Sequence, residues 1–288
     1  MAKLKLKLDD NVEGNYFVDS TCIDCSACRR FAPSTFGDGE DFAFVKKQPV
    51  LEAEIHSANQ ALLSCPTASI GTVEKVNLHS AKGSFPIELI PGIYINGFNK
   101  KDSYGADSYF IESDSGNWLV DSPRFIKNLV RKFEELGGIK YVFLTHQDDV
   151  ADAHLYANHF QAKRIIHRMD SSAQKDSEII LQGEENFLIE KAKIIFTPGH
   201  TEGHLVMLWD NKYLFTGDHF AWLRRLKRWG SFRDLCWDSW EKQIKSVEKL
   251  NRFEEVQWVF PGHGNRGEIE KGKFPDVIND SVAWMKTV

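Results

Sequence analysis

The sequence predicts an α+β protein built from two domains. Its 288 residues, of which 42% are hydrophobic, suffice for two domains with ordinary buried cores. Four of the five cysteines fall within the first 80 residues, and the stretch 75–90 mixes Lys, Ser, Gly and Pro in the manner of a linker. We therefore expect one domain over residues 1–80 and another over residues 81–288.

The first domain alternates short apolar segments with a cysteine-rich loop. Strands are expected at 16–18, 42–45 and 70–73, and a helix at 51–63. A further helix after the cysteine loop is only weakly marked. The order indicates a βαββαβ outline.

The cysteine spacing predicts an iron-sulfur site. Cys22, Cys25 and Cys28 are each separated by two residues, and Cys65 follows as Cys-Pro. Three thiolates on one tight loop can bind one face of a cubane, and a distant cysteine can supply the fourth ligand. Zinc is the alternative, but zinc sites commonly pair two C-x2-C units.

The same residues resemble the bacterial-type ferredoxins. In their two-cluster members a fourth cysteine precedes Pro in the first run, whereas this chain has Ala32-Pro33 there. The resemblance therefore implies a ferredoxin-like domain with one 4Fe-4S cluster, bound by Cys22, Cys25, Cys28 and Cys65.

The second domain is predicted to alternate strands and helices in two halves. Strands are expected near 87–95, 108–112 and 118–120, and again at 141–144, 194–196 and 258–260. One helix is expected to begin at Ser122-Pro123 and another at Asp238, with Glu241 completing a capping box. A last helix follows Pro275. The expected buried stripes are Phe125, Leu129, Phe133 and Leu136 in the first helix, and Trp240, Ile244, Val247 and Leu250 in the second.

Histidines and an aspartate follow the ends of these strands. His146 follows 141–144, His200 follows 194–196 through Pro198-Gly199, and His263 follows 258–260. A hairpin formed by 205–209 and 213–215 leads to Asp218. At a strand end an imidazole can reach a metal without entering the core, so we expect a metal site here.

The stretch 87–288 resembles the metallo-β-lactamase superfamily. That family carries an Asp after an early strand, a His-rich loop, G-H-T-x-G-H, G-D and a late G-H, which here are Asp121, His146, His200, Asp218 and His263. The resemblance implies an αββα sandwich. It also implies that Asp121 orients the site through hydrogen bonds and that His204 serves packing. His159, His167 and His219 are taken as ordinary structural residues.

The loop after His146 departs from the family pattern His-x-His-x-Asp-His. Without gaps, Asp148 takes the place of the second His and the final pair is lost. With two extra residues, Asp152 takes the Asp position and His154 lies one step out of register. The alternative is structural: Asp148 and Asp149 as a solvated turn, Asp152 as a helix cap and His154 on the surface.

The resemblance then implies two metal positions. The first comprises His146, Asp148 and His200, and the second comprises Asp152, Asp218 and His263, with His154 as a further candidate. Asp152 and Asp218 are the predicted catalytic residues, with Asp218 bridging both ions. One or two ions are expected. Imidazoles suit zinc, whereas this carboxylate content favours iron or manganese.

Three functions remain open. The first is a metal-dependent hydrolase of ester, thioester or lactone bonds, in which metal ions hold the attacking water. The second is an oxidoreductase, because the flavodiiron proteins resemble this domain, carry a carboxylate at the place of Asp148 and use di-iron chemistry. In it the 4Fe-4S cluster replaces their flavin domain as electron donor. The third is an electron-transfer or sensing module with a degenerate metal site.

Composition limits the partners. A net charge of -5 argues against nucleic acid, and no stretch approaches the roughly 20 apolar residues of a membrane helix. The first ten residues lack an apolar signal core, and the cysteines carry cluster spacing, so we expect a cytoplasmic protein. A small-molecule substrate and a redox partner protein are expected. The Trp- and Arg-rich segment 221–240 either lines a pocket for an anionic substrate or acidic partner, or packs as a surface loop.

Overall fold

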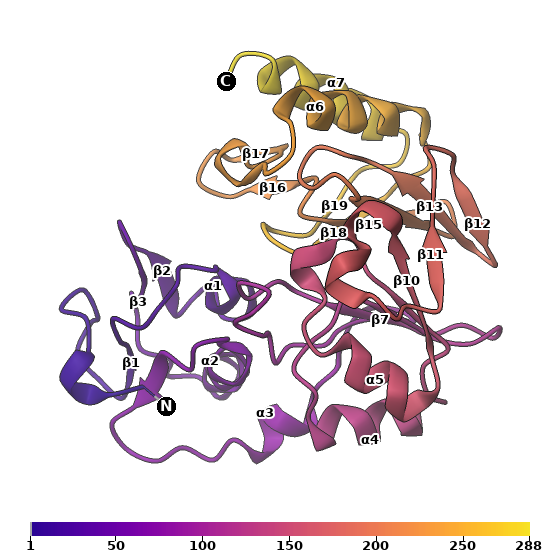
Figure 1. Ribbon diagram of the computed structural model, residues 1–288. Coiled ribbons are helices and arrows are strands. Elements are labelled where there is room, and N and C mark those ends of the chain that lie inside the picture. Colours follow the sequence, from indigo (N-terminus) through magenta and orange to yellow (C-terminus); the bar gives the residue numbers. More distant parts are fainter. Residues whose placement is uncertain (1) are drawn as a thin grey trace.

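A computed structural model describes residues 2–288 and shows a small N-terminal domain beside a larger two-sheet sandwich (Figure 1). The small domain runs β1 (Tyr16–Val18), α1 (Ala27–Phe31), β2 (Phe36–Asp38), β3 (Ala43–Val45), α2 (Glu52–Ser64) and β4 (Ile70–Thr72). Strand β1 pairs with β4 and β2 pairs with β3, both antiparallel. The predicted βαββαβ order is confirmed.

The sequence assigned no strand to β2. Phe36 pairs with Val45 across the β2–β3 hairpin, and both side chains are buried in the core of the small domain. A three-residue strand with a glycine at its centre has too little pattern of its own to be recognised. Its partner strand and the core beneath it determine its conformation.

The sandwich contains two sheets. The first has seven strands in the order β11-β10-β9-β8-β7-β6-β5, namely β5 (Ile87–Ile90), β6 (Ile93–Ile95), β7 (Tyr109–Ile111), β8 (Trp118–Val120), β9 (Tyr141–Phe143), β10 (Lys163–His167) and β11 (Ile179–Leu181). The second has six in the order β12-β13-β14-β15-β18-β19, namely β12 (Phe187–Ile189), β13 (Ala192–Phe196), β14 (Leu205–Trp209), β15 (Tyr213–Gly217), β18 (Trp258–Pro261) and β19 (Gly267–Glu268).

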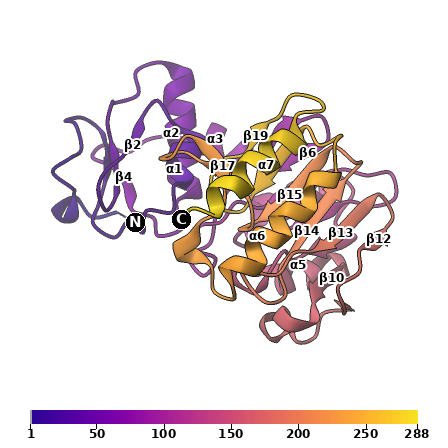
Figure 2. The same cartoon turned by 90° about the horizontal axis from the view of Figure 1, so that it is seen from above.

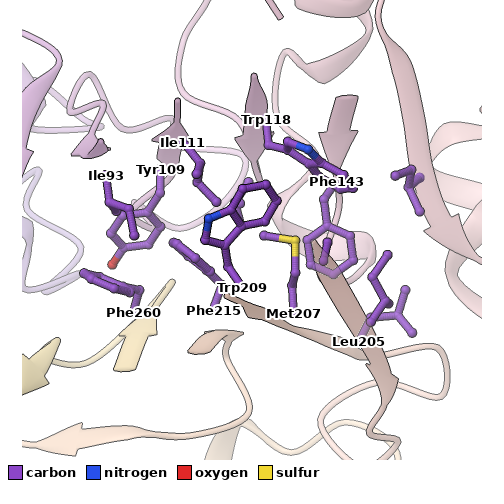
Figure 3. Close-up of a cluster of buried hydrophobic side chains, with 14 of the residues drawn as sticks. Ile93, Tyr109, Ile111, Trp118, Phe143, Leu205, Met207, Trp209, Phe215 and Phe260 are labelled. Carbon is purple, nitrogen blue, oxygen red and sulfur yellow. The ribbon is translucent and has the colours of Figure 1, made fainter. Parts of the chain in front are cut away.

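The core between the sheets explains why the central strands are apolar on both faces. In β14, Leu205, Met207 and Trp209 point toward the other sheet, where Trp118 and Phe143 meet them (Figure 3). The alternate residues Val206 and Leu208 pack under the helices on the outer face. Every residue of β14 is therefore buried.

Helices cover both outer faces of the sandwich (Figures 1 and 2). α4 (Lys127–Glu135) and α5 (Ala153–Phe160) pack on the first sheet, and α6 (Trp240–Glu248) and α7 (Phe274–Met285) pack on the second. The last helix, which the sequence placed after Pro275, begins at Phe274, so Pro275 lies in its first turn. The predicted αββα sandwich is confirmed.

Helix α4 begins at Lys127 rather than at Ser122. The Ser122 hydroxyl donates to the carbonyl of Pro123 (3.1 Å), and the N–H of Phe125 donates to Asp152 (2.8 Å). These bonds leave the segment before Lys127 outside the helix. Leu129 and Phe133 are buried as predicted, whereas Phe125 and Leu136 are half-buried.

Helix α6 is capped by Ser239 rather than Asp238. The Ser239 hydroxyl accepts from the N–H of Lys242 (3.3 Å), while the Asp238 carboxylate bonds the Lys242 ammonium (3.0 Å). Ile244, Val247 and Leu250 are buried as predicted and Trp240 is half-buried. The alternation of polar and apolar residues located the helix, and the cap lies one residue further on.

The connection between the domains contains its own structure. α3 (His79–Gly83) includes residues 80 and 81, between which the sequence places the domain boundary. That boundary stays a prediction. Phe85 is fully buried and packs against Phe31 of the small domain (5.8 Å between ring centroids) and Phe98 of the large one (4.9 Å). Over the described chain, residues 2–288, no helix has the length and apolar character that crossing a bilayer requires.

Candidate metal centre and iron-sulfur site

The metal-binding candidates follow the carboxyl ends of four strands. His146 follows β9, His200 follows β13, Asp218 follows β15 and His263 follows β18. β15 and β18 run parallel, and β14 returns the chain between β13 and β15, so three of the four ends belong to one sheet. The facing sheet supplies His146.

Three of the predicted ligands form one group. The ligand atoms of His146, Asp148 and His200 all lie within 4.8 Å of one another. Asp148 Oδ2 lies 3.9 Å from the Nε2 atoms of both histidines. Both imidazoles are buried, whereas the Asp148 side chain is 47% exposed, so the group opens to solvent on the carboxylate side.

The two imidazoles present free nitrogen atoms to this group. Within residues 2–288 the buried Nε2 atoms of His146 and His200 have no hydrogen-bond partner. Burial, together with the neighbouring His200, lowers the pKa of His146 to about 3. A neutral imidazole with an unshared buried lone pair is the form that binds a metal.

A hydrogen-bond chain orients His146. Asp121 accepts from the Thr145 N–H (2.9 Å) and hydroxyl (2.9 Å), and that hydroxyl lies 2.9 Å from His146 Nδ1. With Asp121 ionised, the Thr145 hydroxyl donates to it and must accept from Nδ1–H, which leaves Nε2 free for a metal. Burial raises the pKa of Asp121 to about 8. A nearby cation would oppose this effect and favour the ionised form that the hydrogen-bond chain requires. This geometry agrees with the orienting role expected for Asp121.

A second group contains a residue that the sequence did not indicate. His146, Asp149 and Asp218 also bring their ligand atoms within 4.8 Å. Asp149, for which the sequence offered a solvated turn as the structural alternative, is only 1% exposed, and its two oxygens have no partner among the described residues. Burial and the nearby Asp218 raise its pKa well above the usual range. An uncompensated buried carboxylate is costly unless a proton or cation neutralises it.

His263 pairs with Asp218. Its Nδ1 lies 2.8 Å from Asp218 Oδ2, its backbone N–H donates to Oδ1 (3.0 Å), and its Nε2 donates to the Tyr104 carbonyl (3.3 Å). Burial alone would lower the pKa of His263, but Asp218 raises it overall. Burial likewise opposes ionisation of Asp218, yet the charged His263 holds that pKa well below the usual range. In this arrangement both ring nitrogens of His263 are engaged.

Two further predicted ligands lie apart from these groups. Asp152 bonds the Lys100 ammonium (2.5 Å) and the Phe125 N–H, and its side chain caps no helix. His154 lies exposed on α5. The start of α5 turns His154 to solvent and directs Asp152 toward the α4 segment, so the structure does not bring them to His146.

A buried aspartate that the sequence did not reveal fixes the two metal-binding loops together. Asp170 accepts from the Gln147 N–H (3.2 Å), the Thr201 hydroxyl (2.5 Å) and the Gly203 N–H (3.0 Å). A side chain at Gly203 would meet Asp170 atoms at 2.6–2.8 Å, so only glycine fits there. Asp170 lies in a short 3-10 helix without a recognisable motif, and only the fold places it here.

The other histidines have structural surroundings. His204 is fully buried, with its ring 5.2 Å from those of His146 and His219. His167 stacks on Phe196 (4.4 Å), and His159 pairs with Glu134 on the surface (2.8 Å). Burial lowers the pKa of His219 to about 3.

The four predicted cluster ligands line one pocket. Cys22, Cys25, Cys28 and Cys65 are all unpaired thiols, and residues of both β1 and β4 close the pocket. The loop reaches this shape through left-handed backbone at Asp24 (φ +52°) and Ser26 (φ +64°). The Ser69 N–H donates to the Cys65 sulfur (3.2 Å).

This pocket fits an iron-sulfur cluster. Burial, and to a smaller extent repulsion from the thiolates of Cys65 and Cys22, raises the pKa of Cys25 to about 12. Four thiols held together in one pocket, two of them buried and two half-buried, need a cationic centre to become ligands. N–H groups directed at sulfur are the donors expected around a cluster.

The Arg-rich segment forms a hairpin that contacts the small domain. β16 (Ala221–Leu223) pairs with β17 (Arg228–Gly230), and the hairpin projects toward α1 in both overall views (Figures 1 and 2). At its tip Arg224 bonds Asp38 and Arg225 bonds Asp24 (3.2 Å). Further along, Trp237 is 63% exposed with its ring 6.5 Å from that of His200. The segment therefore contacts both sites.

The two parts of the chain are similar to different known proteins. Residues 18–72 match the family model of the 4Fe-4S single cluster domain of Ferredoxin I, and all four ligand cysteines lie in that range. A curated relative, the "Beta-lactamase-like protein 2 homolog" of Drosophila melanogaster, is 27% identical over 197 residues, which cover 61% of this chain. The alignment spans 64% of that relative's length.

Solved structures match the sandwich. The DIM-1 metallo-β-lactamase aligns with 19% identity and a TM-score of 0.52, covering 67% of this chain and 95% of its own. The metallo-β-lactamase from Hirschia baltica aligns with 17% identity and a TM-score of 0.54, covering 69% and 95%. Identities this low establish the fold alone. The chain thus joins a single-cluster 4Fe-4S ferredoxin domain to a domain with the metallo-β-lactamase fold.

Proposed function

We propose that this protein is an oxidoreductase in which iron at the sandwich centre receives electrons from the 4Fe-4S cluster. The observation that carries the proposal is the donor set. His146, His200 and Asp148 form a two-histidine, one-carboxylate group that opens to solvent, which is the arrangement typical of non-haem iron. Asp149 and Asp218 add two more carboxylates beside it.

Iron in this group would supply one-electron chemistry at an open coordination position, and the cluster would deliver electrons singly. The protein residues have separate tasks. Thr145 and Asp121 hold His146 with Nε2 toward the site, and Asp170 keeps the loop after His146 against the loop after His200. His263 stabilises the charge of Asp218.

The substrate of this proposal is a small oxidised molecule that reaches the open side of Asp148. Trp237 stands beside His200 (6.5 Å between ring centroids) and would shield the reacting group from water. A separate one-electron donor protein is required to reduce the cluster after each transfer, and this is the redox partner expected from the sequence.

A second candidate is the metal-dependent hydrolase of ester, thioester or lactone bonds. The observation in its favour is the second donor group of His146, Asp149 and Asp218 beside the first, because two adjacent metals can clamp an attacking water. If the protein is a hydrolase, the oxidation state of the 4Fe-4S cluster should not affect turnover. The two candidates therefore differ in metal and in redox dependence.

A metal competition tests the proposal. Protein with an intact cluster is offered Fe²⁺ and Zn²⁺ together without oxygen, and the metal retained by the sandwich is measured for wild type and for Asp148→His. Zinc binds most divalent sites more tightly than ferrous iron, so the comparison between the two proteins carries the test: we expect the wild type to retain a larger share of iron than Asp148→His, in which imidazole replaces the carboxylate. Zinc retention by the wild type, with ester hydrolysis unaffected by cluster reduction, would favour the hydrolase instead.

A further inference from the structure

One segment of the sandwich domain touches the cluster loop. Gly105 has left-handed backbone (φ +84°), and a side chain there would meet Cys25 Cβ and Sγ at 2.8 Å and Pro66 at 2.9 Å. Only glycine allows the backbone to approach a cluster ligand this closely. Cys25 and Pro66 come from both parts of the cluster-binding sequence, so the contact lies at the edge of the cluster pocket.

The same segment touches the metal centre on its other side. The carbonyl of Tyr104, the residue before Gly105, accepts from His263 Nε2 (3.3 Å), and His263 Nδ1 pairs with Asp218 (2.8 Å). The N–H of Asp107 donates to the carbonyl of Gly262 (2.8 Å), the residue before His263. The segment Tyr104–Asp107 therefore lies between Cys25 and the Asp218–His263 pair.

A buried ion pair holds the segment against the small domain. Arg30 binds both carboxylate oxygens of Asp107 (2.7 and 3.0 Å), and the two side chains are 2% and 1% exposed. Arg30 also donates to the carbonyls of Cys25 (3.0 Å) and Gly105 (3.3 Å). Asn99 donates to Gly105 (2.8 Å) and Asp107 (2.9 Å).

Such a pair is unusual for domains that merely share a chain. Removing two charges from water is costly, and the cost is offset only by complete, well-directed bonding. Here the guanidinium bonds both oxygens of Asp107 and the Gly105 carbonyl across the interface, so relative motion of the two domains would break these three bonds together. The contact is therefore specific and rigid.

We propose that the segment Tyr104–Asp107 is the route by which electrons pass from the cluster to the sandwich metal. The route runs from Cys25 across its contact with Gly105, through the Tyr104 carbonyl to His263, and on to Asp218. This inference rests on the proposed function. In the step the reduced cluster loses one electron, a ferric ion in the sandwich gains it and becomes ferrous, and no covalent bond breaks. A one-electron donor protein, or a photoreduced deazaflavin in the experiment, resupplies the cluster.

The test measures transfer directly. In protein with an intact cluster and ferric iron in the sandwich, a light flash with deazaflavin reduces the cluster, and the reduced-cluster and ferric signals are followed by freeze-quench electron paramagnetic resonance. We expect the reduced-cluster signal to decay at a rate independent of protein concentration, because donor and acceptor are in one molecule. The ferric signal should fall in step.

Two glycine variants locate the route. Gly105→Ala inserts a methyl group against Cys25 and should slow the decay at least severalfold, because it pushes the donor away from the segment that carries the electron. Gly183→Ala is the matched control, because its backbone has nearly the same φ (+88°) and an added Cβ meets nothing within 4 Å. The control should transfer electrons at the wild-type rate.

A milder variant covers the case in which Gly105→Ala does not assemble a cluster. Asn99→Ala removes two hydrogen bonds that hold the segment but adds no clash. It should keep the cluster and also slow the decay. The route is overturned if the reduced-cluster signal of Asn99→Ala decays at the wild-type rate and Gly105→Ala either does the same or assembles no cluster.

The outcomes also separate the route from the function. Decay that accelerates with protein concentration would mean transfer between molecules, which overturns the route while the proposed redox function stands. A ferric ion that resists every one-electron reductant would sink the proposed function, and the route with it.

Discussion

The cluster pocket and the metal centre are held by different kinds of structure. Three of the four cluster ligands lie on one short stretch, a loop with Cys22 and Cys25 followed by Cys28 in the first turn of α1, and two left-handed residues shape that loop. The metal centre instead collects side chains from the ends of strands between residues 146 and 218, on two sheets. A local loop keeps its ligands together by sequence alone, whereas the metal centre depends on the packing of the whole sandwich.

The largest expected effect tests the independence of the two sites. Cys25→Ala should reduce cluster iron and acid-labile sulfide from about four each per chain to near zero, because a cubane needs all its thiolates. Sandwich metal, measured after chelation of loose ions, should remain. Cys236→Ala is the matched control, since this cysteine bonds the Gly199 carbonyl and lies outside the pocket. Parallel loss of both metals in Cys25→Ala would mean that the sites fold as one.

The interface between the sites should be the next most sensitive. Asp107→Asn leaves the Arg30 charge buried without its partner, which should lower the free energy of unfolding by about 3–5 kcal/mol. Urea denaturation monitored by Trp fluorescence measures it. Glu135→Gln, in the exposed Lys132–Glu135 pair (2.8 Å), should have a far smaller effect, because water screens that pair. A similar small loss for both variants would show that the interface is loose.

Substitutions of two aspartates test which carboxylates bind the sandwich metal. Asp149→Asn should weaken metal binding at the sandwich by at least about tenfold, because a buried carboxylate aimed at the site is lost. Asp152→Asn should leave metal affinity unchanged, because that side chain bonds Lys100 and Phe125 instead. Titration with a fluorescent competitor chelator distinguishes them. The reverse result would restore the lengthened-loop alignment expected from the sequence.

The smallest expected effect concerns the hairpin tip. Arg225 is exposed where it pairs with Asp24 (3.2 Å), so Arg225→Ala should lower stability by no more than about 1 kcal/mol. The difference should disappear in 1 M salt, where exposed charges are screened within about 3 Å. Thermal unfolding at low and high salt checks this. A larger loss that persists in salt would mean that the hairpin contributes more than charge to the domain contact.

The sequence alone determined the features that depend on local pattern. The cysteine spacing predicted a single-cluster ferredoxin domain, and the apolar alternation located most strands, because neighbouring residues decide both. The sequence also brought His146, Asp148 and His200 into one predicted metal position, since strand ends of a sandwich meet at one edge.

Only the tertiary structure decided what lies buried beside those residues. Asp149 and Asp170 read as polar loop residues, yet among residues 2–288 Asp149 is buried without a hydrogen-bond partner and Asp170 accepts from two other loops. Ser122 reads as a helix cap, yet Asp152, remote in sequence, binds the Phe125 N–H and the helix begins only at Lys127. Arg30 and Asp107 likewise show no pattern separately, although they join the two domains. Burial changes the cost of a charge by several kcal/mol, and burial is a property of the folded chain rather than of any stretch of sequence.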